Sequence, residues 1–216
     1  MDDFERELLE AQEQRSQAWR DARCGKFTAS EIWKLMVNPR GKKDWSDTAL
    51  TYIKTKVAEE ITGLVHQASP AYPLVWGEEQ EPFAKEFLKI KYGYEITKAG
   101  FLAFTDHSGG TPDGYIDGKV LEIKCPYNSA NHIEYMMLET AEDLLDFKPE
   151  NYYQCQANML FAKKDKCLLV SYDGRFPDDK IIKRLEFYAN PEIQNLILQR
   201  LEGAIEMKLE LLKRFK

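Results

Sequence analysis

The sequence has no run of roughly 18 or more apolar residues, and its N-terminus, Met1-Asp2-Asp3, lacks the basic and then apolar pattern of a signal segment. These absences favour a soluble, cytoplasmic chain with no membrane partner. The four cysteines are scattered without a C-x-x-C pair, which argues against a zinc site or a disulfide framework.

The sequence also lacks an excess of basic residues. A net charge of −6 argues against a general nucleic-acid coat, because non-specific affinity comes from neutralising phosphates with Lys and Arg. Any DNA contact must therefore be localised. The best candidate is a loop that carries Arg40, Lys42 and Lys43, since positive charge on a projecting arm can reach DNA. Further basic clusters lie at 163–166 and 208–216, and each of the three can equally be a solvated face.

The composition is that of a globular chain, with 216 residues, 44% of them apolar and 12% aromatic. No repeat or long linker divides it, so we expect one domain over residues 1–216. Hydrophobic periodicity and turn signals predict helices at 3–20, 28–37, 48–62, 76–92, 129–146, 149–162 and from 191 onward. The same signals predict strands at 94–97, 100–106, 112–117, 119–125, 167–173 and 180–189.

Helix caps refine this outline. Thr28-x-x-Glu31 is a capping-box pattern that would open the helix at 28–37. Asn190 followed by Pro191 predicts the start of the last helix, whose apolar stripe is either core or a subunit interface. Pro82 either kinks the helix at 76–92 or marks its first turn.

The segment from Thr111 to Cys125 contains the strongest local signal. Asp117-Gly118 between two runs of apolar and β-branched residues predicts a hairpin with a two-residue type I′ turn. That turn pairs residue 116 with 119, 115 with 120 and 114 with 121. Asp113 would then face Glu122 with Cβ atoms roughly 5 Å apart.

This register gives the hairpin a polar face and an apolar face. Lys124 lies two residues beyond Glu122 and shares its face, whereas Leu121 and Ile123 point to the core. Facing carboxylates destabilise a sheet unless a cation lies between them, and Mg²⁺ binds a few carboxylates together with phosphate oxygens. The pattern thus indicates a metal site for phosphodiester cleavage. The alternative is an ordinary solvated hairpin with scattered charges.

Two other segments bear on chemistry. Ser30 in the first turn of a capped helix, with Arg23 upstream, is a plausible phosphate pocket, because helix N-termini and guanidinium groups bind anions. The alternative is a capped helix with a surface arginine. The amides of Gln154-x-Gln156 can equally form a polar edge of the core.

Several motifs occur in a characteristic order: Trp19, Arg23, Thr28-Ala29-Ser30-Glu31, Trp76-Gly77-x-x-x-Glu81, Pro112-Asp113-Gly114, Leu121-Glu122-Ile123-Lys124-Cys125-Pro126 and Gln154-x-Gln156. In this order they resemble the phage lambda exonuclease family, the YqaJ-like viral recombinase branch of the PD-(D/E)xK nucleases. The resemblance covers most of the chain. It implies an α/β fold, with a central mixed β-sheet flanked by helices and a restriction-endonuclease-like core.

The resemblance also implies roles for individual residues. Asp113, Glu122 and the backbone carbonyl of Ile123 would hold one Mg²⁺, and Asp113 with Glu81 would hold a second, with Mn²⁺ able to substitute. Lys124 would orient or activate the attacking water. In a two-metal site one ion generates the nucleophile and the other stabilises the leaving oxygen.

Other matching positions concern the DNA. Arg23, Ser30, Thr111 and Gln156 correspond to a pocket for the terminal 5′-phosphate. Thr111 departs from the best-known member of the family, which has serine there, although the hydroxyl is kept. Arg40 corresponds to an arginine that enters a DNA groove, and Leu74 to an apolar wedge that separates the terminal bases.

Together these residues predict a Mg²⁺-dependent 5′→3′ exonuclease that acts on double-stranded DNA with a 5′-phosphorylated end. The family implies a ring-shaped homotrimer, a 3′ overhang as product, and a phage-type single-strand annealing protein as partner in the bacterial host cytoplasm. Two alternatives remain, an endonuclease of the same superfamily and a non-catalytic DNA-clamp ring subunit. An end-phosphate pocket argues against the first, and the intact Asp113, Glu122 and Lys124 against the second.

Overall fold

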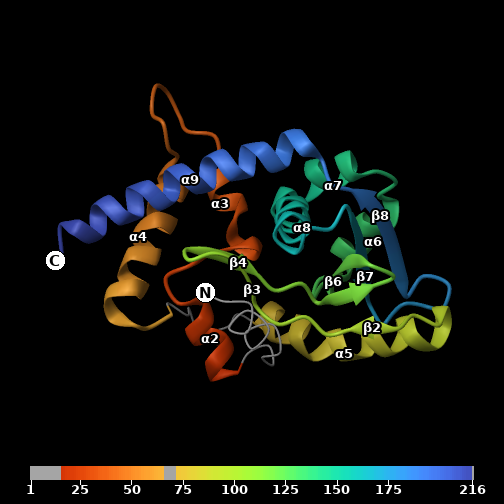
Figure 1. The fold of residues 1–216 in the computed structure, drawn as a ribbon. Coiled ribbons are helices and arrows are strands. Elements are labelled where there is room, and N and C mark those ends of the chain that lie inside the picture. Colours follow the sequence, from red (N-terminus) through yellow and green to blue (C-terminus); the bar gives the residue numbers. More distant parts are fainter. Residues whose placement is uncertain (1–15, 66–71, 216) are drawn as a thin grey trace.

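Two β-sheets organise the chain, and the computed structural model describes residues 16–65 and 72–215 of it (Figure 1). One sheet has five strands in the order β2-β5-β6-β7-β8, and the other has three in the order β1-β4-β3. The strands are β1 Phe27–Thr28, β2 Ile96–Thr97, β3 Leu102–Thr105, β4 Ser108–Gly110, β5 Gly114–Ile116, β6 Lys119–Lys124, β7 Lys166–Tyr172 and β8 Ile182–Tyr188.

Helices precede, interrupt and follow these strands. In chain order the described helices are α2 Gln17–Arg23, the 3₁₀ turn η1 Ala29–Glu31, α3 Trp33–Met36, α4 Asp47–Thr62, α5 Tyr72–Tyr92, α6 Ser129–Met137, α7 Ala141–Phe147, α8 Pro149–Ala162 and α9 Pro191–Lys213. None of these described helices is long and apolar enough to cross a membrane.

The larger sheet is mixed and is covered by helices on both faces. β6 and β7 are parallel and are joined by α6, α7 and α8, whereas the other pairs in this sheet are antiparallel. Ala84 and Leu88 of α5 pack on one face, and Cys155 and Met159 of α8 pack on the other. A further core joins α3, α4 and α9 to α8. The predicted class, a mixed sheet flanked by helices, is confirmed.

The hairpin register predicted from Asp117-Gly118 is confirmed. The paired residues are Gly114 with Leu121, Tyr115 with Val120 and Ile116 with Lys119. Asp117 and Gly118 have φ values of 48° and 77°, the left-handed conformations that a type I′ turn requires. A local turn signal therefore fixes which side chains of β6 meet Asp113.

The helix predicted at 28–37 is present only in part, as η1 at Ala29–Glu31 and α3 at Trp33–Met36, and the capping box predicted at Thr28 is wrong. Thr28 ends β1, which pairs with β4, and its N–H donates to the Tyr52 hydroxyl oxygen at 3.0 Å. No side-chain cap forms at Thr28, and Glu31 pairs with Lys34 instead of closing a capping box. Because this stretch is held by contacts distant in sequence, the local cap pattern does not decide its structure.

Other boundaries also differ from those predicted. The helix predicted at 129–146 is two helices, because Thr140 and Asp143 form a capping box that starts α7. α5 begins at Tyr72 rather than near residue 76, with Pro82 in its interior. Residues 108–110 form β4, which was not among the predicted strands. The predicted helix at 3–20 lies mostly outside the described residues.

The last helix begins as predicted. The side chain of Asn190 accepts hydrogen bonds from the backbone N–H groups of Glu192 and Ile193, at 3.0 and 3.2 Å. Its apolar stripe is divided between two environments. Ile197 and Leu201 are buried in the core, whereas others, Leu196, Leu209 and Phe215, are exposed.

Candidate active site

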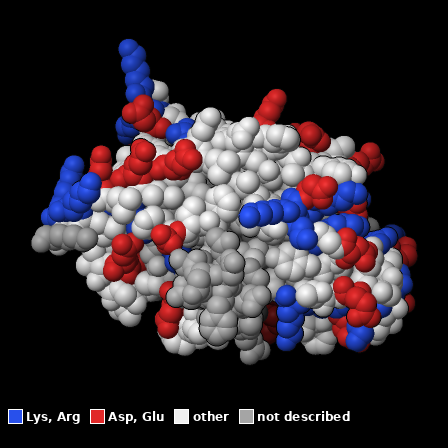
Figure 2. Space-filling view, in the orientation of Figure 1, with Lys and Arg blue, Asp and Glu red and all other residues white. Residues whose placement is uncertain are grey.

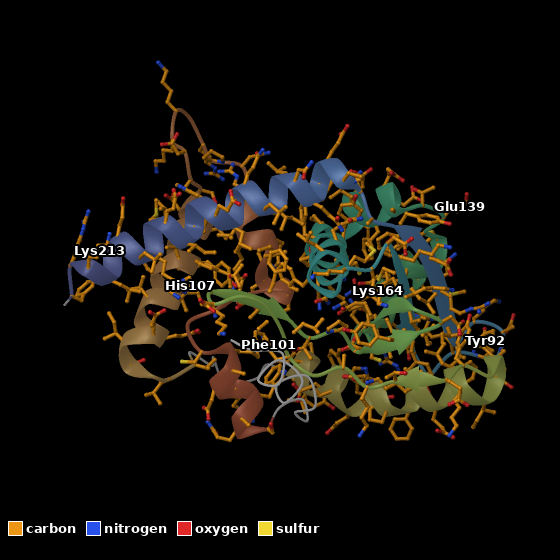
Figure 3. All side chains as sticks on the ribbon, in the orientation of Figure 1. Tyr92, Phe101, His107, Glu139, Lys164 and Lys213 are labelled. Carbon is orange, nitrogen blue, oxygen red and sulfur yellow. The ribbon has the colours of Figure 1, made fainter. Side chains whose placement is uncertain are left out.

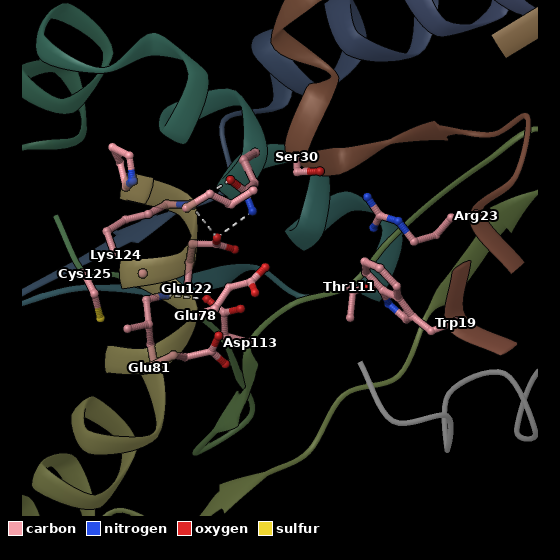
Figure 4. A pocket seen from close by; sticks show the side chains of 15 residues that line it. Trp19, Arg23, Ser30, Glu78, Glu81, Thr111, Asp113, Glu122, Lys124 and Cys125 are labelled. Carbon is pink, nitrogen blue, oxygen red and sulfur yellow. Dashed lines mark hydrogen bonds and ion pairs between the residues drawn. The ribbon is translucent and has the colours of Figure 1, made fainter. Parts of the chain in front are cut away.

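A pocket of about 370 Å³ opens where α5, the β5–β6 hairpin and α8 meet (Figure 4). Most of the residues predicted for a site line it, namely Arg23, Ser30, Leu74, Glu81, Thr111, Asp113, Glu122, Ile123 and Lys124. It also includes Trp19, Glu78 and Gln154, which the sequence did not single out for this site. The fold thus brings together residues as far apart in sequence as Trp19 and Gln154.

Asp113 lies just before β5, at the point where the hairpin ladder ends. Its Oδ2 accepts a hydrogen bond from the backbone N–H of Ile123 at 2.6 Å, which ties the carboxylate to the opposite strand. Burial, and then the negative charges of Glu122 and Glu81, raise the pKa of Asp113 well above its usual value. A bound cation would relieve this repulsion.

Glu122 is almost fully buried on β6, and three donors hold it. Lys124 Nζ and Gln154 Nε2 reach Oε1 at 2.8 and 2.5 Å, and Asn158 Nδ2 reaches Oε2 at 3.0 Å. A buried carboxylate is stable only when charged or polar groups compensate for lost water. Two of the three donors come from α8, so this helix determines where the carboxylate points.

Lys124 lies at the end of β6 beside Glu122. Its Nζ also donates to Oε1 of Gln154 at 2.9 Å. Burial lowers the pKa of its ammonium, but the carboxylates of Glu122 and Asp113 outweigh that effect, so the pKa is raised above its usual value. Lys124 is therefore a charged donor in this structure, suited to orienting a bound oxygen rather than accepting a proton.

The donor set matches a hard divalent cation. The carboxylates of Glu78, Glu81, Asp113 and Glu122 lie around one part of the pocket (Figure 4), and Mg²⁺ prefers such oxygen ligands. As placed, however, no three His, Cys, Asp or Glu side chains within residues 16–65 and 72–215 could hold an ion together. Glu81 Oε1 lies 2.7 Å from Nζ of Lys85. An ion shared with Asp113 would have to draw Glu81 away from that lysine.

The other end of the pocket is suited to an anion (Figure 4). The Arg23 guanidinium lies 4.2 Å from the centre of the Trp19 ring, and the Trp19 Nε1–H donates to the Thr111 hydroxyl at 3.0 Å. Burial lowers the pKa of Arg23, although a guanidinium stays charged in proteins. Ser30 lies in η1 at the same end of the pocket. These groups can present hydrogen-bond donors and one positive charge to a phosphate.

The structure does not bring Gln156 to this pocket. Its side chain is fully buried, where Nε2 donates to the Tyr188 carbonyl at 3.2 Å and Oε1 accepts from the Asn190 N–H at 2.9 Å. Residues two apart on a helix point to different sides, so Gln154 and Gln156 cannot both face the carboxylates. The structure therefore does not place Gln156 beside the other predicted phosphate ligands, and Gln154 lines the pocket instead.

Asn158 is a further residue that sequence reasoning missed. It lies one helical turn after Gln154 on the same face of α8, and both donate to Glu122. Its Oδ1 is buried without a donor from the described residues, and a Cβ added at Gly110 would lie 2.5 Å from that oxygen. The four-residue spacing of Gln154 and Asn158, two polar residues on one face of a buried helix, could have indicated that both face the site.

The predicted DNA-binding loop lies apart from the pocket. Arg40, Lys42 and Lys43 are exposed on the segment between α3 and α4, which projects from the molecule (Figure 1). Figure 2 shows positive charge at its tip, whereas acidic and basic side chains are intermingled elsewhere on this face. Lys43 pairs with Asp47 at 3.1 Å. Leu74, the predicted wedge, is 57% exposed at the pocket wall.

The chain is similar to a known protein family and to solved structures. Residues 18–165 match the model of a family described as the YqaJ-like viral recombinase domain. The crystal structure of an alkaline exonuclease from Laribacter hongkongensis is similar, with 25% identity, a TM-score of 0.78, and coverage of 93% of this chain and 96% of that one. Its complex with dAMP matches at 26% identity with the same TM-score and coverage.

A phage related exonuclease from Haemophilus somnus 129PT shares the fold, with 16% identity and a TM-score of 0.72 over 88% of this chain and 96% of that one. No curated protein sequence matches the chain.

Proposed function

The chain belongs to the YqaJ-like viral recombinase domain family, and from that membership we propose that it is a 5′→3′ exonuclease. It digests one strand of linear double-stranded DNA from a 5′-phosphorylated end and leaves a 3′ single-stranded overhang. The observation that carries this proposal is one pocket with Asp113, Glu122 and Lys124 in one part and the Arg23 guanidinium in another. Such a pocket can hold a terminal phosphate while the next phosphodiester lies among the carboxylates.

The proposal requires a divalent cation, for which the oxygen donors described above are suited. Asp113, Glu122, Glu81 and the carbonyl of Ile123 would hold Mg²⁺, two ions per site, with Mn²⁺ able to substitute. When bound, the ions supply a hydroxide nucleophile near neutral pH and stabilise the leaving oxygen. Lys124, held in place by Glu122 and Gln154, orients the attacking water with its ammonium group.

Arg23, Ser30 and Thr111 bind the terminal 5′-phosphate. Arginine suits this role because its guanidinium can form two parallel hydrogen bonds to phosphate oxygens. Contact with Trp19 restricts the Arg23 side chain, and Trp19 is in turn fixed by Thr111. Restricting these side chains before binding reduces the entropy lost when the phosphate arrives.

Further residues, on the projecting loop and at the pocket wall, guide the duplex DNA to the pocket. Arg40, Lys42 and Lys43 on the projecting loop contact the duplex, and Leu74 separates the terminal bases at the pocket wall. We infer a ring-shaped homotrimer around the duplex and a phage-type single-strand annealing protein that receives the overhang, both in the bacterial host cytoplasm. The support for these last inferences is the family resemblance.

Linear and closed circular duplexes test the reaction directly. The linear DNA carries either 5′-phosphate or 5′-hydroxyl ends, and each substrate is incubated with Mg²⁺ or with EDTA. In Mg²⁺ we expect fast digestion of the 5′-phosphorylated linear DNA, slower digestion of the 5′-hydroxyl linear DNA and no cleavage of the circle, and in EDTA we expect no cleavage of any substrate. Nicking of the circle would instead identify an endonuclease, and binding without any digestion would identify a clamp.

The Arg23→Ala variant tests the phosphate pocket. We expect it to lower the preference for 5′-phosphate over 5′-hydroxyl ends by about 10-fold or more, because a charged hydrogen bond contributes about 1.5–3 kcal/mol. Initial rates on the two linear substrates measure this ratio. Arg20→Ala, on the same helix, serves as the control. An unchanged ratio in Arg23→Ala would contradict the assignment.

A further inference from the structure

A second cleft of about 600 Å³ adjoins the catalytic pocket. The two share a wall made of Pro73, Leu74, Lys124 and Cys125. Beyond this wall the second cleft is lined by Tyr127, Asn128, Asn131, Lys148 and Asn151, among others. Because Lys124 and Leu74 border both spaces, a chain molecule can pass from one to the other without leaving the surface.

The order of groups in the pocket gives this passage a direction. Arg23 and Thr111 lie on one side of the carboxylates, and Lys124 and Cys125 lie on the other (Figure 4). A strand whose terminal phosphate is at Arg23, and whose first phosphodiester is among the carboxylates, must continue past Lys124. The second cleft begins at that point.

Tyr127 gives this cleft a partly exposed aromatic ring, with 44% of the residue accessible. Neighbouring rings hold it in place. The Tyr127 ring packs edge to face against Tyr72 and Trp76, with centroid distances of 5.0 Å to Tyr72 and 5.9 Å to Trp76. Arg175 also donates to the Tyr127 carbonyl at 2.9 Å and lies 4.6 Å from the centre of the Trp76 ring. An aromatic side chain fixed in this way is a suitable platform for a nucleobase.

The cleft also has charge and hydrogen-bonding groups for a nucleotide. Lys148, just before α8, lines the cleft together with Glu150, from which its Nζ lies 3.7 Å away, and the Lys148 side chain is 32% exposed, so it can turn towards a phosphate in the cleft. Asn131 offers an amide that can donate and accept. Stacking on a ring combined with a nearby cation binds single-stranded nucleic acid with little dependence on base identity. An exonuclease that degrades any sequence needs that tolerance.

We propose that the second cleft binds the second nucleotide of the strand being cut, the one on the 3′ side of the scissile bond. Its base stacks on Tyr127, and the phosphate that follows it lies near Lys148. This inference rests on the proposed function, because it takes the terminal phosphate to be at Arg23. It adds a binding site that keeps the shortened strand in place after the first nucleotide is released.

The test uses duplexes with 2-aminopurine, a fluorescent base whose emission falls on stacking, at the first, second or sixth nucleotide from the 5′-phosphate. Ca²⁺ replaces Mg²⁺ to prevent cleavage. When the DNA is bound, 2-aminopurine at the second nucleotide should emit more strongly with Tyr127→Ala than with the unsubstituted protein. At the first and sixth nucleotides the two proteins should give the same emission. We also expect Tyr127→Ala to weaken DNA binding by about 5- to 150-fold, the range for loss of one stacked base.

Matched variants separate stacking from a change in fold. Tyr127→Phe keeps the ring and should behave as the unsubstituted protein does, as should Tyr188→Ala, which removes an exposed tyrosine on β8. The inference would be overturned if Tyr127→Ala and the unsubstituted protein gave equal emission from 2-aminopurine at the second nucleotide. It would also be overturned if their emission differed at the first nucleotide instead. If the unsubstituted protein does not digest linear duplex in Mg²⁺, the proposed function itself fails, and the two failures are thereby distinguished.

Discussion

Two of the lysines that lie beside carboxylates, Lys208 and Lys124, differ in their surroundings. Lys208 of α9 is 1% exposed, forms an ion pair with Glu60, and donates to the Gly25 carbonyl at 2.6 Å. It also lies 3.3 Å from Nδ1 of His107, which Figure 3 places in the turn between β3 and β4, close to α9. The side chain of Lys124 is 23% exposed and faces the pocket.

The balance of charge distinguishes the two sites. Around Lys208 one cation is matched by one carboxylate and a carbonyl, so the group joins α9 to α4 and to the turn before β1. Around Lys124 several carboxylates share one pocket, and the pKa of Asp113 is raised as a result. A buried ion pair without an excess of charge is structural, whereas an excess of negative charge beside open space invites a cation.

The largest expected effect is that of Lys124→Ala. Removing the donor that orients the attacking group should lower the rate of digestion by at least about 10²–10³-fold, the loss seen when one such donor is removed. DNA binding should persist, because Arg23 and the projecting loop are unchanged. Single-turnover digestion of 5′-labelled duplex and a binding titration measure the two quantities.

Lys119→Ala is the matched control, since Lys119 lies on the same strand and pairs with Glu186 rather than with the pocket. Digestion by Lys124→Ala at the rate of this control would show that the lysine has no role in the reaction.

A smaller effect is expected from Gln154→Ala, which removes a group that contacts both Glu122 and Lys124. Loss of such an outer partner of a metal ligand typically lowers activity by about 10–100-fold. Gln156→Ala should instead lower the free energy of unfolding by about 1–3 kcal/mol, because Tyr188 and Asn190 lose their partner.

Urea denaturation and digestion rates per folded molecule separate the two effects. The opposite pattern, with Gln156→Ala inactive but stable, would return Gln156 to the site.

These two glutamines also mark how far the sequence could predict the site. Asp117-Gly118 fixes the hairpin locally, so the meeting of Asp113 and Glu122 followed from spacing alone. Which glutamine faces Glu122 depends on how α8 is rotated against the sheet, which is set by packing of buried residues from distant segments. The sequence pattern predicts that this segment is a helix, but it does not predict which face of the helix packs against the sheet.

Contacts between distant segments, which the sequence pattern does not reveal, also explain why the structures around Thr28 and Lys208 differ from those expected. Thr28 enters a strand because β4, far along the chain, offers it a partner, and this competes with the local cap. Lys208 belongs to a basic run that was expected either to contact DNA or to form a solvated face, yet it is buried and contacts Glu60 and the Gly25 carbonyl. Contacts distant in sequence decided both cases.

Lys208→Met tests whether Lys208 stabilises the fold without taking part in the reaction. It leaves the buried carbonyl of Gly25 without a donor, and we expect a loss of about 1–3 kcal/mol in the free energy of unfolding. The digestion rate per folded molecule should not change. Urea denaturation gives the first quantity, and rates normalised to the folded fraction give the second. A stable but inactive variant would mean that this cluster also serves the reaction.

The smallest change in stability is expected from Asn158→Leu. Leucine has a similar volume and removes the buried Oδ1 that has no donor among the described residues, which partly offsets the lost hydrogen bond to Glu122. Because the buried Glu122 carboxylate nonetheless loses a donor, the free energy of unfolding should fall by about 1–2 kcal/mol. The digestion rate should fall by about 10-fold, because Glu122 loses one of its positioning donors. A large loss of stability with an unchanged rate would place Asn158 with Lys208, as a structural residue, rather than with Lys124.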